Sequence, residues 1–188
     1  METVSRENYL RVKIVELMVP RLFYDPGTVL YIGAYNRRFS CSLPLYKAGN
    51  EITVLEVWEP FLEGLRTSRF KGRVAHFVLG DVTKLEDAPL SRDLYDYSVW
   101  LHGPEHVGKG EGIQAVRELE QITKKTVVLA MPWGQNRHGV AYGNPYTQHK
   151  SVWYPEDFPG YQISATGPKD RLGGNLLLWK DMDNRGKG

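Results

Sequence analysis

The chain has 188 residues, of which 41% are hydrophobic and 24% are charged. This length and composition are those of one ordinary globular domain, so they exclude a disordered chain and a collagen-like repeat. Lysine and arginine number 24 against 22 aspartates and glutamates, and this near balance gives no indication of a nucleic-acid or membrane partner.

The cysteine content and the hydropathy pattern indicate the compartment. Cys41 is the only cysteine, which excludes a disulfide framework and a thiolate zinc site and suits a reducing environment. No apolar run reaches the ~18 residues of a membrane-spanning helix, and the charged N-terminal segment does not resemble a signal peptide. We therefore expect a cytoplasmic protein.

Residues 1–20 are predicted to hold a lead-in helix that covers one side of a sheet. Leu10, Ile14, Leu17 and Met18 follow helical spacing and would lie on one face. Pro20 would end this helix, because a proline lacks the N–H donor and clashes with the preceding turn.

Short and almost unbroken apolar runs follow the lead-in helix. Continuous runs are typical of strands buried on both faces, as in a parallel sheet. The runs cover residues 28–33, 52–57, 73–80, 95–101 and 126–131. Residues 109–123 carry apolar side chains at helical spacing, and residues 60–68 form a weaker helical pattern. Strands alternating with helices predict a doubly wound α/β sheet.

The last third of the chain has a different pattern. Residues 132–158 show no periodicity and are rich in glycine, proline and aromatic residues, which indicates a long loop or lid. Residues 161–167 and 175–180 read as two strands whose short connection permits only antiparallel pairing. We expect one domain over residues 1–180, with a mostly parallel seven-stranded sheet, and a polar tail over residues 181–188.

Candidate ligand-binding residues follow the predicted strands, because ligands of open parallel sheets bind beyond the carboxyl ends of the strands. Gly33 follows the first strand, where glycine lets the backbone approach a ligand closely. Glu56 ends the second strand, and its carboxylate can accept both hydroxyls of a ribose. Asp81 follows the third strand, and its carboxylate can accept a hydrogen bond from an adenine amino group. Together these residues favour a nucleoside ligand.

At this point the chain resembles the class I S-adenosylmethionine-dependent methyltransferases. The resemblance covers roughly residues 28–180 and includes the terminal antiparallel hairpin. It is carried by the segments VLYIGA, ITVLEVWEPFLEGL, FVLGDV and YDYSVWLHGPEHV. The resemblance implies a Rossmann-like methyltransferase fold, S-adenosylmethionine as cofactor and a small-molecule acceptor.

The resemblance also implies roles for individual residues. It places Gly33 beside the methionine part of the cofactor, Glu56 on the ribose, Val57 or Trp58 against the adenine, and Asp81 with Val82 at the adenine edge. His102 would lie near the transferred methyl group. Glu105 and His106 resemble the Glu-His pair that follows the fourth strand in many small-molecule members. His102 or His106 would assist deprotonation of the acceptor.

The first glycine motif departs from the family pattern. The family usually has an acidic residue two positions before the first glycine and two further glycines at alternate positions, where this chain has Tyr31, Tyr35 and Arg37. Two functions therefore remain open. One is methyl transfer to oxygen or nitrogen of a small molecule, and the other is a non-catalytic module that has lost the cofactor.

Two other motif readings are weaker. A nicotinamide-binding fold needs G-x-G-x-x-G after the first strand, and Tyr35 and Arg38 replace two of its glycines. The letters H-x-x-E-H at residues 102–106 match an inverted zinc-protease motif, which requires a helix. Gly103 and Pro104 directly after a strand disfavour that helix, so we expect no metal site.

The long loop supplies candidate substrate contacts, namely Trp133, Tyr142, Asn144 and His149. Their rings would form the walls of a pocket, and the polar groups would orient the acceptor. Alternatively, the aromatic residues cover an edge of the sheet. Stacking of nucleobases is disfavoured, because Arg137, His138 and Lys150 are too few for a groove that follows a phosphate backbone. Whether the chain forms oligomers stays open.

Overall fold

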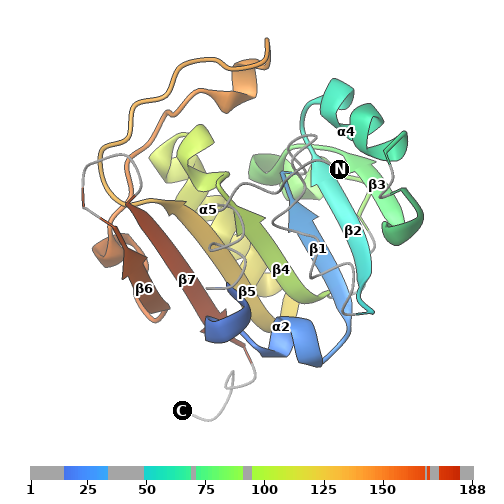
Figure 1. The fold of residues 1–188 in the computed structure, drawn as a ribbon, viewed down its shortest axis with the longest axis horizontal. Helices are drawn as coiled ribbons and strands as arrows, with labels where there is room; N and C mark the ends of the chain where they lie inside the picture. Colours follow the sequence, from blue (N-terminus) through green and yellow to red (C-terminus); the bar gives the residue numbers. More distant parts are fainter. Residues whose placement is uncertain are drawn as a thin grey trace.

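The computed structural model describes residues 15–33, 49–68, 71–90, 95–167, 169 and 174–182. Within them the chain forms a seven-stranded sheet with strand order β3-β2-β1-β4-β5-β7-β6 (Figure 1). Strands β1 to β5 pair in parallel, whereas β7 pairs antiparallel with both β5 and β6. The predicted doubly wound sheet with a terminal antiparallel hairpin is confirmed. The strands are β1 (Thr28–Ile32), β2 (Glu51–Glu56), β3 (His76–Leu79), β4 (Tyr95–Leu101), β5 (Thr123–Pro132), β6 (Gln162–Thr166) and β7 (Asn175–Asp181).

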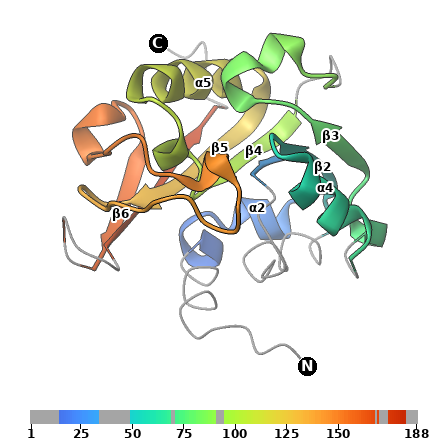
Figure 2. The same ribbon diagram turned by 90° about the horizontal axis from the view of Figure 1, so that it is seen from above.

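Helices cover both faces of the sheet, with α2 on one side and α5 on the other (Figure 2). Residues 15–18 are α-helical, and further α-helices are α2 (Arg21–Tyr24), α4 (Glu59–Arg66) and α5 (Lys109–Gln121). Short 3₁₀ turns form η2 (Lys71–Arg73), η3 (Val82–Asp87), η4 (Pro104–His106), η5 (Pro145–Thr147) and η6 (Pro155–Asp157). The sheet is thus the middle of three layers.

Alternation along the central strands explains the continuous apolar runs. In β1, Val29 and Tyr31 belong to the core cluster that also contains Leu62 and Leu65 of α4. Leu30 and Ile32 belong to the opposite cluster, which includes residues of α5. Successive side chains of a strand point to opposite faces. Because both faces are buried from Val29 to Ile32, each of these four positions of β1 carries an apolar residue.

The structure differs from the sequence expectations at some ends of elements. Residues 15–18 are helical and end before Pro20 as predicted, but Leu17 is exposed, whereas Val15 and Val19 are buried one turn apart. The rest of the predicted helix, with Leu10 and Ile14, lies outside the described residues. Strand β5 begins at Thr123 directly after α5, and β7 reaches Asp181. Met182, the second residue of the predicted polar tail, is buried in the core cluster on the α5 side. Residues 183–188 and Cys41 lie outside the described residues.

Two glycines of α5 give opposite expectations for substitution by alanine. A Cβ on Gly110 would meet no atom within 4 Å, whereas one on Gly112 would lie 2.8 Å from Cζ2 of the buried Trp153. We expect Gly110→Ala to stabilise the fold by up to about 1 kcal/mol, because alanine loses less backbone entropy in a helix. Gly112→Ala should destabilise it by about 1–3 kcal/mol through overpacking. Urea denaturation of the two variants measures the difference, and equal effects would contradict this packing.

A partly buried tyrosine predicts alkaline sensitivity where the hairpin meets α5. The Tyr161 hydroxyl donates to Glu120 Oε1 at 2.9 Å, and Lys180 Nζ donates to Glu120 Oε2 at 2.9 Å. Burial and the neighbouring Glu120 raise the pKa of Tyr161 above its ordinary value of about 10. The folded state therefore keeps a proton that the unfolded chain loses above about pH 10.

The stability that Tyr161 contributes should consequently be complete below pH ~10 and fall as the pH rises further. Tyr161→Phe removes this titration and should flatten the decrease. Some slope should remain, because burial also raises the pKa of Tyr97. Denaturation midpoints between pH 9 and 11 provide the measurement, and an unchanged slope in the variant would contradict the expectation.

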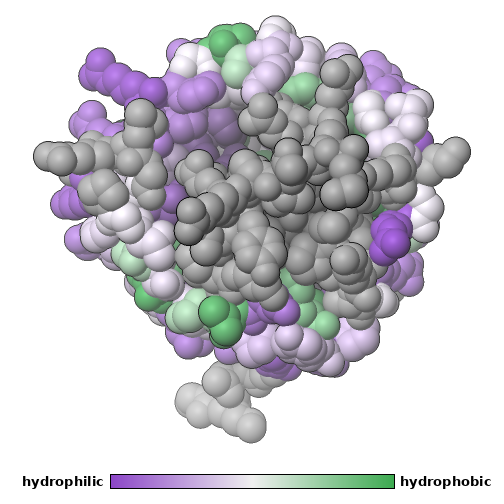
Figure 3. Space-filling view, in the orientation of Figure 1, coloured by the Kyte–Doolittle hydropathy of each residue, from purple (hydrophilic) through white to green (hydrophobic). Residues whose placement is uncertain are grey.

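The described surface on the face shown in Figure 3 is mainly hydrophilic, with small separate hydrophobic patches. Large exposed hydrophobic side chains are scattered along the described residues, and they are Leu17, Met18, Tyr24, Leu79, Val140, Tyr142 and Tyr146. Among the described helices, none combines the length and the apolar character needed to cross a bilayer.

Candidate functional site

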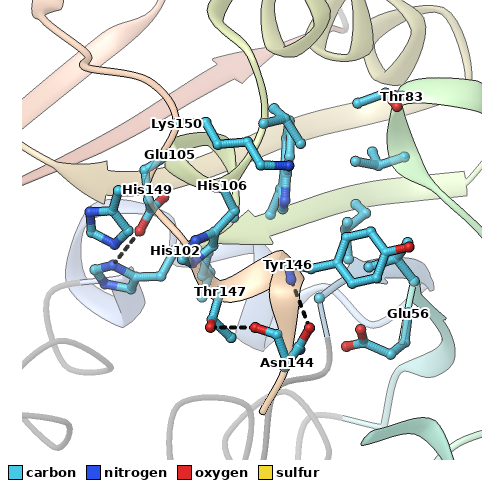
Figure 4. Close-up of a pocket in the computed structure, with 18 of the residues that line it drawn as sticks. Glu56, Thr83, His102, Glu105, His106, Asn144, Tyr146, Thr147, His149 and Lys150 are labelled. Atoms are coloured by element: carbon cyan, nitrogen blue, oxygen red, sulfur yellow. Dashed lines mark hydrogen bonds and ion pairs between the residues drawn. The ribbon is translucent and has the colours of Figure 1, made fainter. Parts of the chain in front are cut away.

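A cavity of about 690 Å³ lies beyond the carboxyl ends of the parallel strands. Its walls come from the residues that follow β1 to β4, from the end of β5 and from the loop over residues 136–150 (Figure 4). This is the edge at which open α/β sheets bind ligands. The volume falls within the ~300–1,000 Å³ of small-molecule and cofactor sites.

Gly33 and Glu56 form one end of the cavity. Gly33 adopts a positive φ of 72°, which favours glycine, and a Cβ there would meet nothing within 4 Å. Its N–H donates to the Leu55 carbonyl at 2.9 Å, which ties the end of β1 to β2. Glu56 is 4% exposed, and its Oε1 accepts the N–H of Trp58 at 2.9 Å. A buried carboxylate of fixed orientation therefore lines this part of the cavity.

Val57 lines the cavity, but Trp58 does not. Trp58 is the N-cap of α4, and the ring that reaches the cavity is that of Phe61, which contacts Trp58 edge-on at a centroid distance of 4.5 Å. Of the two residues expected to lie against the adenine, only Val57 is therefore at the cavity wall. Helical spacing from Trp58 would have identified Phe61 as a candidate.

Asp81 and Val82 line the cavity at the end of β3. Asp81 is the N-cap of η3, and its Oδ1 accepts both the N–H and the hydroxyl of Thr83, at 2.9 and 2.8 Å. One carboxylate oxygen therefore holds the turn, while the residue stays at the cavity wall. Thr83 and Lys84 lie beside it and were not singled out from the sequence.

The turn after β4 brings His102, Glu105 and His106 to the opposite end of the cavity. His102 has a positive φ of 53°, a conformation uncommon outside glycine, and its N–H donates to the Ala130 carbonyl at 2.7 Å. A Cβ on Gly103 would lie 1.8 Å from Nε1 of Trp100. Only glycine fits against this buried indole, so the core positions the turn.

Glu105 is the buried centre of this turn. It is 3% exposed, and its Oε1 lies 3.5 Å from Nδ1 of His102. Burial raises the pKa of Glu105, but the hydrogen bond and the electrostatic attraction of His102 outweigh burial and hold that pKa below its ordinary value. Burial lowers the pKa of His106 by more than the neighbouring Glu105 raises it, which favours a neutral imidazole.

The long loop is joined to the Glu105 turn by backbone hydrogen bonds. The Glu105 carbonyl accepts the N–H of Lys150 at 2.8 Å and of Ser151 at 3.2 Å, and the Ser151 hydroxyl donates to the Pro104 carbonyl at 3.0 Å. These contacts hold His149 beside His106, with a ring-centroid distance of 5.0 Å. No periodicity in the sequence indicates this junction.

Among the loop residues proposed as substrate contacts, Tyr142, Asn144 and His149 line the cavity. Asn144 is buried at 2% exposure, and its Oδ1 accepts the N–H of Tyr146 at 2.8 Å as the N-cap of η5. Asn144 therefore also shapes the loop that carries Tyr142 and Tyr146. His138 lines the cavity as well, although no pattern in the sequence marks it as a site residue.

Trp133 does not line the cavity; it packs against the core cluster on the α5 side of the sheet. Trp153, 1% exposed, lies in the same cluster next to Phe158. These two rings therefore pack in or against the core on the α5 side of the sheet. The residues that depart from the first glycine motif, Tyr35 and Arg37, lie outside the described residues.

No protein-family profile and no curated protein sequence matches the chain. Its fold is similar to that of magnesium protoporphyrin IX methyltransferase from Synechocystis PCC 6803 in two structures, one with bound S-adenosylhomocysteine and one with S-adenosylmethionine. The first has TM-score 0.67, 15% identity, and coverage of 95% of this chain and 84% of that chain. The second has TM-score 0.60, 18% identity, and coverage of 96% and 84%.

A third similar structure is the 1,6-didemethyltoxoflavin-N1-methyltransferase of Burkholderia thailandensis, with bound 1,6-didemethyltoxoflavin and S-adenosylhomocysteine. Its TM-score is 0.59 at 16% identity, with coverage of 94% of this chain and 78% of that chain. These similarities show that the chain has the class I methyltransferase fold.

Proposed function

We propose that this protein, with its class I methyltransferase fold, transfers a methyl group from S-adenosylmethionine to an oxygen or nitrogen atom of a small molecule. The observation that carries the proposal is that one cavity holds the buried Glu56 carboxylate at the end of β2 and the His102–Glu105 pair at the end of β4. The Glu56 carboxylate suits the hydroxyls of a ribose, and the His102–Glu105 pair suits proton transfer from an acceptor. The two ends of the cavity thus match the two reactants of a methyl transfer.

The residues that follow β1 to β3 fit the nucleoside part of this cofactor. The open space at Gly33 lets a ligand approach the backbone, and Glu56 would accept the two ribose hydroxyls. Val57, Phe61 and Asp81 line the cavity. Val57 and Phe61 would offer apolar surface to the adenine, and Asp81 would accept a hydrogen bond from its amino group. When bound, the cofactor supplies an electrophilic methyl carbon, and its sulfur keeps the C–S electron pair when that methyl group leaves.

The residues that follow β4 are assigned to the acceptor. The proton of the acceptor hydroxyl or amine would pass to His102, with Nε2 as the receiving atom because Nδ1 faces Glu105. Glu105 orients His102, and Tyr142, Asn144 and His149 surround the acceptor end. The loop over residues 136–150 would exclude water and hold the acceptor in line, which is the main contribution a protein makes to this reaction.

Thermal denaturation of the full chain with added ligands tests the proposal. We expect both S-adenosylmethionine and S-adenosylhomocysteine to raise the melting temperature by several degrees, because a ligand at 100 times its Kd stabilises the native state by about 2.7 kcal/mol. NAD serves as the control nucleotide and should leave the melting temperature unchanged.

The other outcomes point to other functions. Unchanged melting temperature with millimolar S-adenosylmethionine and S-adenosylhomocysteine would refute the proposal and favour a binding module without a cofactor. A shift with NAD alone would indicate a nicotinamide-binding protein. If both adenosyl ligands bind, transfer of labelled methyl groups to a panel of phenols, carboxylates and amines would then identify the acceptor atom.

A further inference from the structure

A cluster of possible metal ligands lies at the acceptor end of the cavity and is formed by Glu105, His106 and His149. Each of them offers one ligand atom, and these atoms lie within 4.8 Å of one another. Glu105 and His106 come from η4 after β4, and His149 comes from the long loop (Figure 4). Two imidazole nitrogens and one carboxylate oxygen are a common ligand set of zinc sites that keep a further position open.

Hydrogen bonds orient both histidines of the cluster. Nδ1 of His149 bonds to the Asn136 carbonyl, and Nδ1 of His106 bonds to the Gln148 carbonyl at 3.4 Å. A carbonyl oxygen can only accept, so in each ring Nδ1 is the donor, and in the neutral ring Nε2 carries the lone pair. Histidines that bind metals usually donate their other N–H to a carbonyl or carboxylate in this way.

Glu105 also has a buried carboxylate oxygen without a hydrogen-bond partner among the described residues. Its Oε1 faces His102, but Oε2 is buried without a hydrogen-bond partner within the part of the chain that the structure describes. Leaving a buried carboxylate oxygen unpaired costs free energy, and an ion is one of the groups that can satisfy it. The orientation of the carboxylate by His102 corresponds to the supporting contacts around metal ligands.

We propose that Glu105, His106 and His149 bind one divalent ion of the zinc class. Nitrogen donors favour zinc, nickel or copper over magnesium, which prefers oxygen ligands. Tetrahedral coordination with bonds of about 2.1 Å places ligand atoms about 3.4 Å apart, so small side-chain rotations would close the cluster around an ion. The backbone hydrogen bonds from Lys150 and Ser151 to the Glu105 carbonyl already hold the two segments together.

The sequence expectation of no metal site rested on a different set of ligands. The H-x-x-E-H letters suggest His102 and His106 on one helix, and residues 104–106 indeed form only a short 3₁₀ turn. The cluster uses His106 and replaces His102 by His149 from the distant loop. An ion there would share the cavity with the acceptor, and an acceptor oxygen could occupy its open position.

Metal titration of the full chain after treatment with EDTA tests this site without any cofactor or substrate. We expect one equivalent of Zn²⁺ to bind in calorimetry and one equivalent of Co²⁺ to develop a visible absorption spectrum on binding. His149→Ala and Glu105→Gln should each weaken Zn²⁺ binding by at least about 100-fold, because even the outer partners of metal ligands contribute 10- to 100-fold.

Two other histidines give matched controls. His138 also lines the cavity but does not belong to the cluster, and His76 lies on β3 with a side chain that is 65% exposed. His138→Ala and His76→Ala should bind Zn²⁺ as the parent chain does. Circular dichroism shows whether the Glu105 variant is folded, and His149→Ala provides an independent test.

Absence of stoichiometric binding, or an equal loss in the His138 and His149 variants, would overturn the proposal. Binding of Mg²⁺ as tight as that of Zn²⁺ would also overturn it, because magnesium does not need the imidazoles. Zinc binding without any effect of S-adenosylmethionine on the melting temperature would support this site and refute methyl transfer, so the two proposals fail separately.

Discussion

Replacing Trp153 by alanine is expected to lower the free energy of unfolding by about 3–5 kcal/mol, the usual cost of removing a buried tryptophan side chain. Trp153 is 1% exposed, packs against Phe158 at a centroid distance of 5.2 Å and contacts the position of Gly112 on α5. Its carbonyl accepts the N–H of Gly134 at 2.9 Å. The side chain thus anchors the returning end of the long loop to the helix.

Urea denaturation of the Trp153→Ala variant measures this loss as a shift of the midpoint at constant m value. Tyr142→Ala is the matched control from the same loop, because its ring is 66% exposed and its removal should change stability by less than about 0.5 kcal/mol. If Trp153→Ala cost no more than the control, the ring would not be packed in the core. Because His149 lies close to this anchor in sequence, the variant should also weaken zinc binding.

Replacing Glu56 by alanine should weaken the binding of S-adenosylhomocysteine by about 13- to 160-fold. This corresponds to the ~1.5–3 kcal/mol of a hydrogen bond to a charged group. The Glu56 carboxylate is buried, and the N–H of Trp58 fixes its orientation. S-adenosylhomocysteine has the ribose that Glu56 would bind, so isothermal titration calorimetry measures the effect without turnover. Glu56→Gln keeps the shape and one acceptor oxygen, and its loss should be smaller.

The other end of β2 offers a matched control. Glu51 begins the same strand, and its side chain is 62% exposed. Glu51→Ala should leave the affinity for S-adenosylhomocysteine unchanged, because Glu51 lies at the amino end of β2 and the cavity lies at its carboxyl end. Equal affinity of the Glu56→Ala variant and the parent chain would remove Glu56 from the ribose site, even if the cofactor binds.

Most of the predicted sheet could be derived from local sequence patterns. The apolar run of β1 predicts a strand buried on both faces, and the structure divides Val29 and Leu30 between the two core clusters. The ends of elements were less accurate, since β5 starts at Thr123 and the buried side of residues 15–19 is that of Val15 and Val19. The spacing of apolar residues shows that one face of an element will be buried. It does not show which neighbouring element will pack on that face or how far the contact will extend.

The candidate site was predicted only in part, as the aromatic residues illustrate. Trp58 and Trp133 were proposed as ligand contacts, yet Phe61 lines the cavity and Trp58 does not, and Trp133 packs against the core cluster on the α5 side. Composition identifies a residue that could stack on a ligand. The direction of its side chain depends on the local backbone. Trp58 lies at the start of α4, and Trp133 directly follows β5.

The sequence by itself determined the parallel sheet and the group of Gly33, Glu56, Asp81 and His102 at one edge, because parallel strands all place their carboxyl ends on the same side. Only the tertiary structure decided that His149 lies beside Glu105 and His106. That contact depends on hydrogen bonds between the Glu105 carbonyl and the backbone of residues 150–151. Hydrogen bonds between backbone groups of distant segments leave no side-chain pattern in either segment, so they become visible only when the chain is folded.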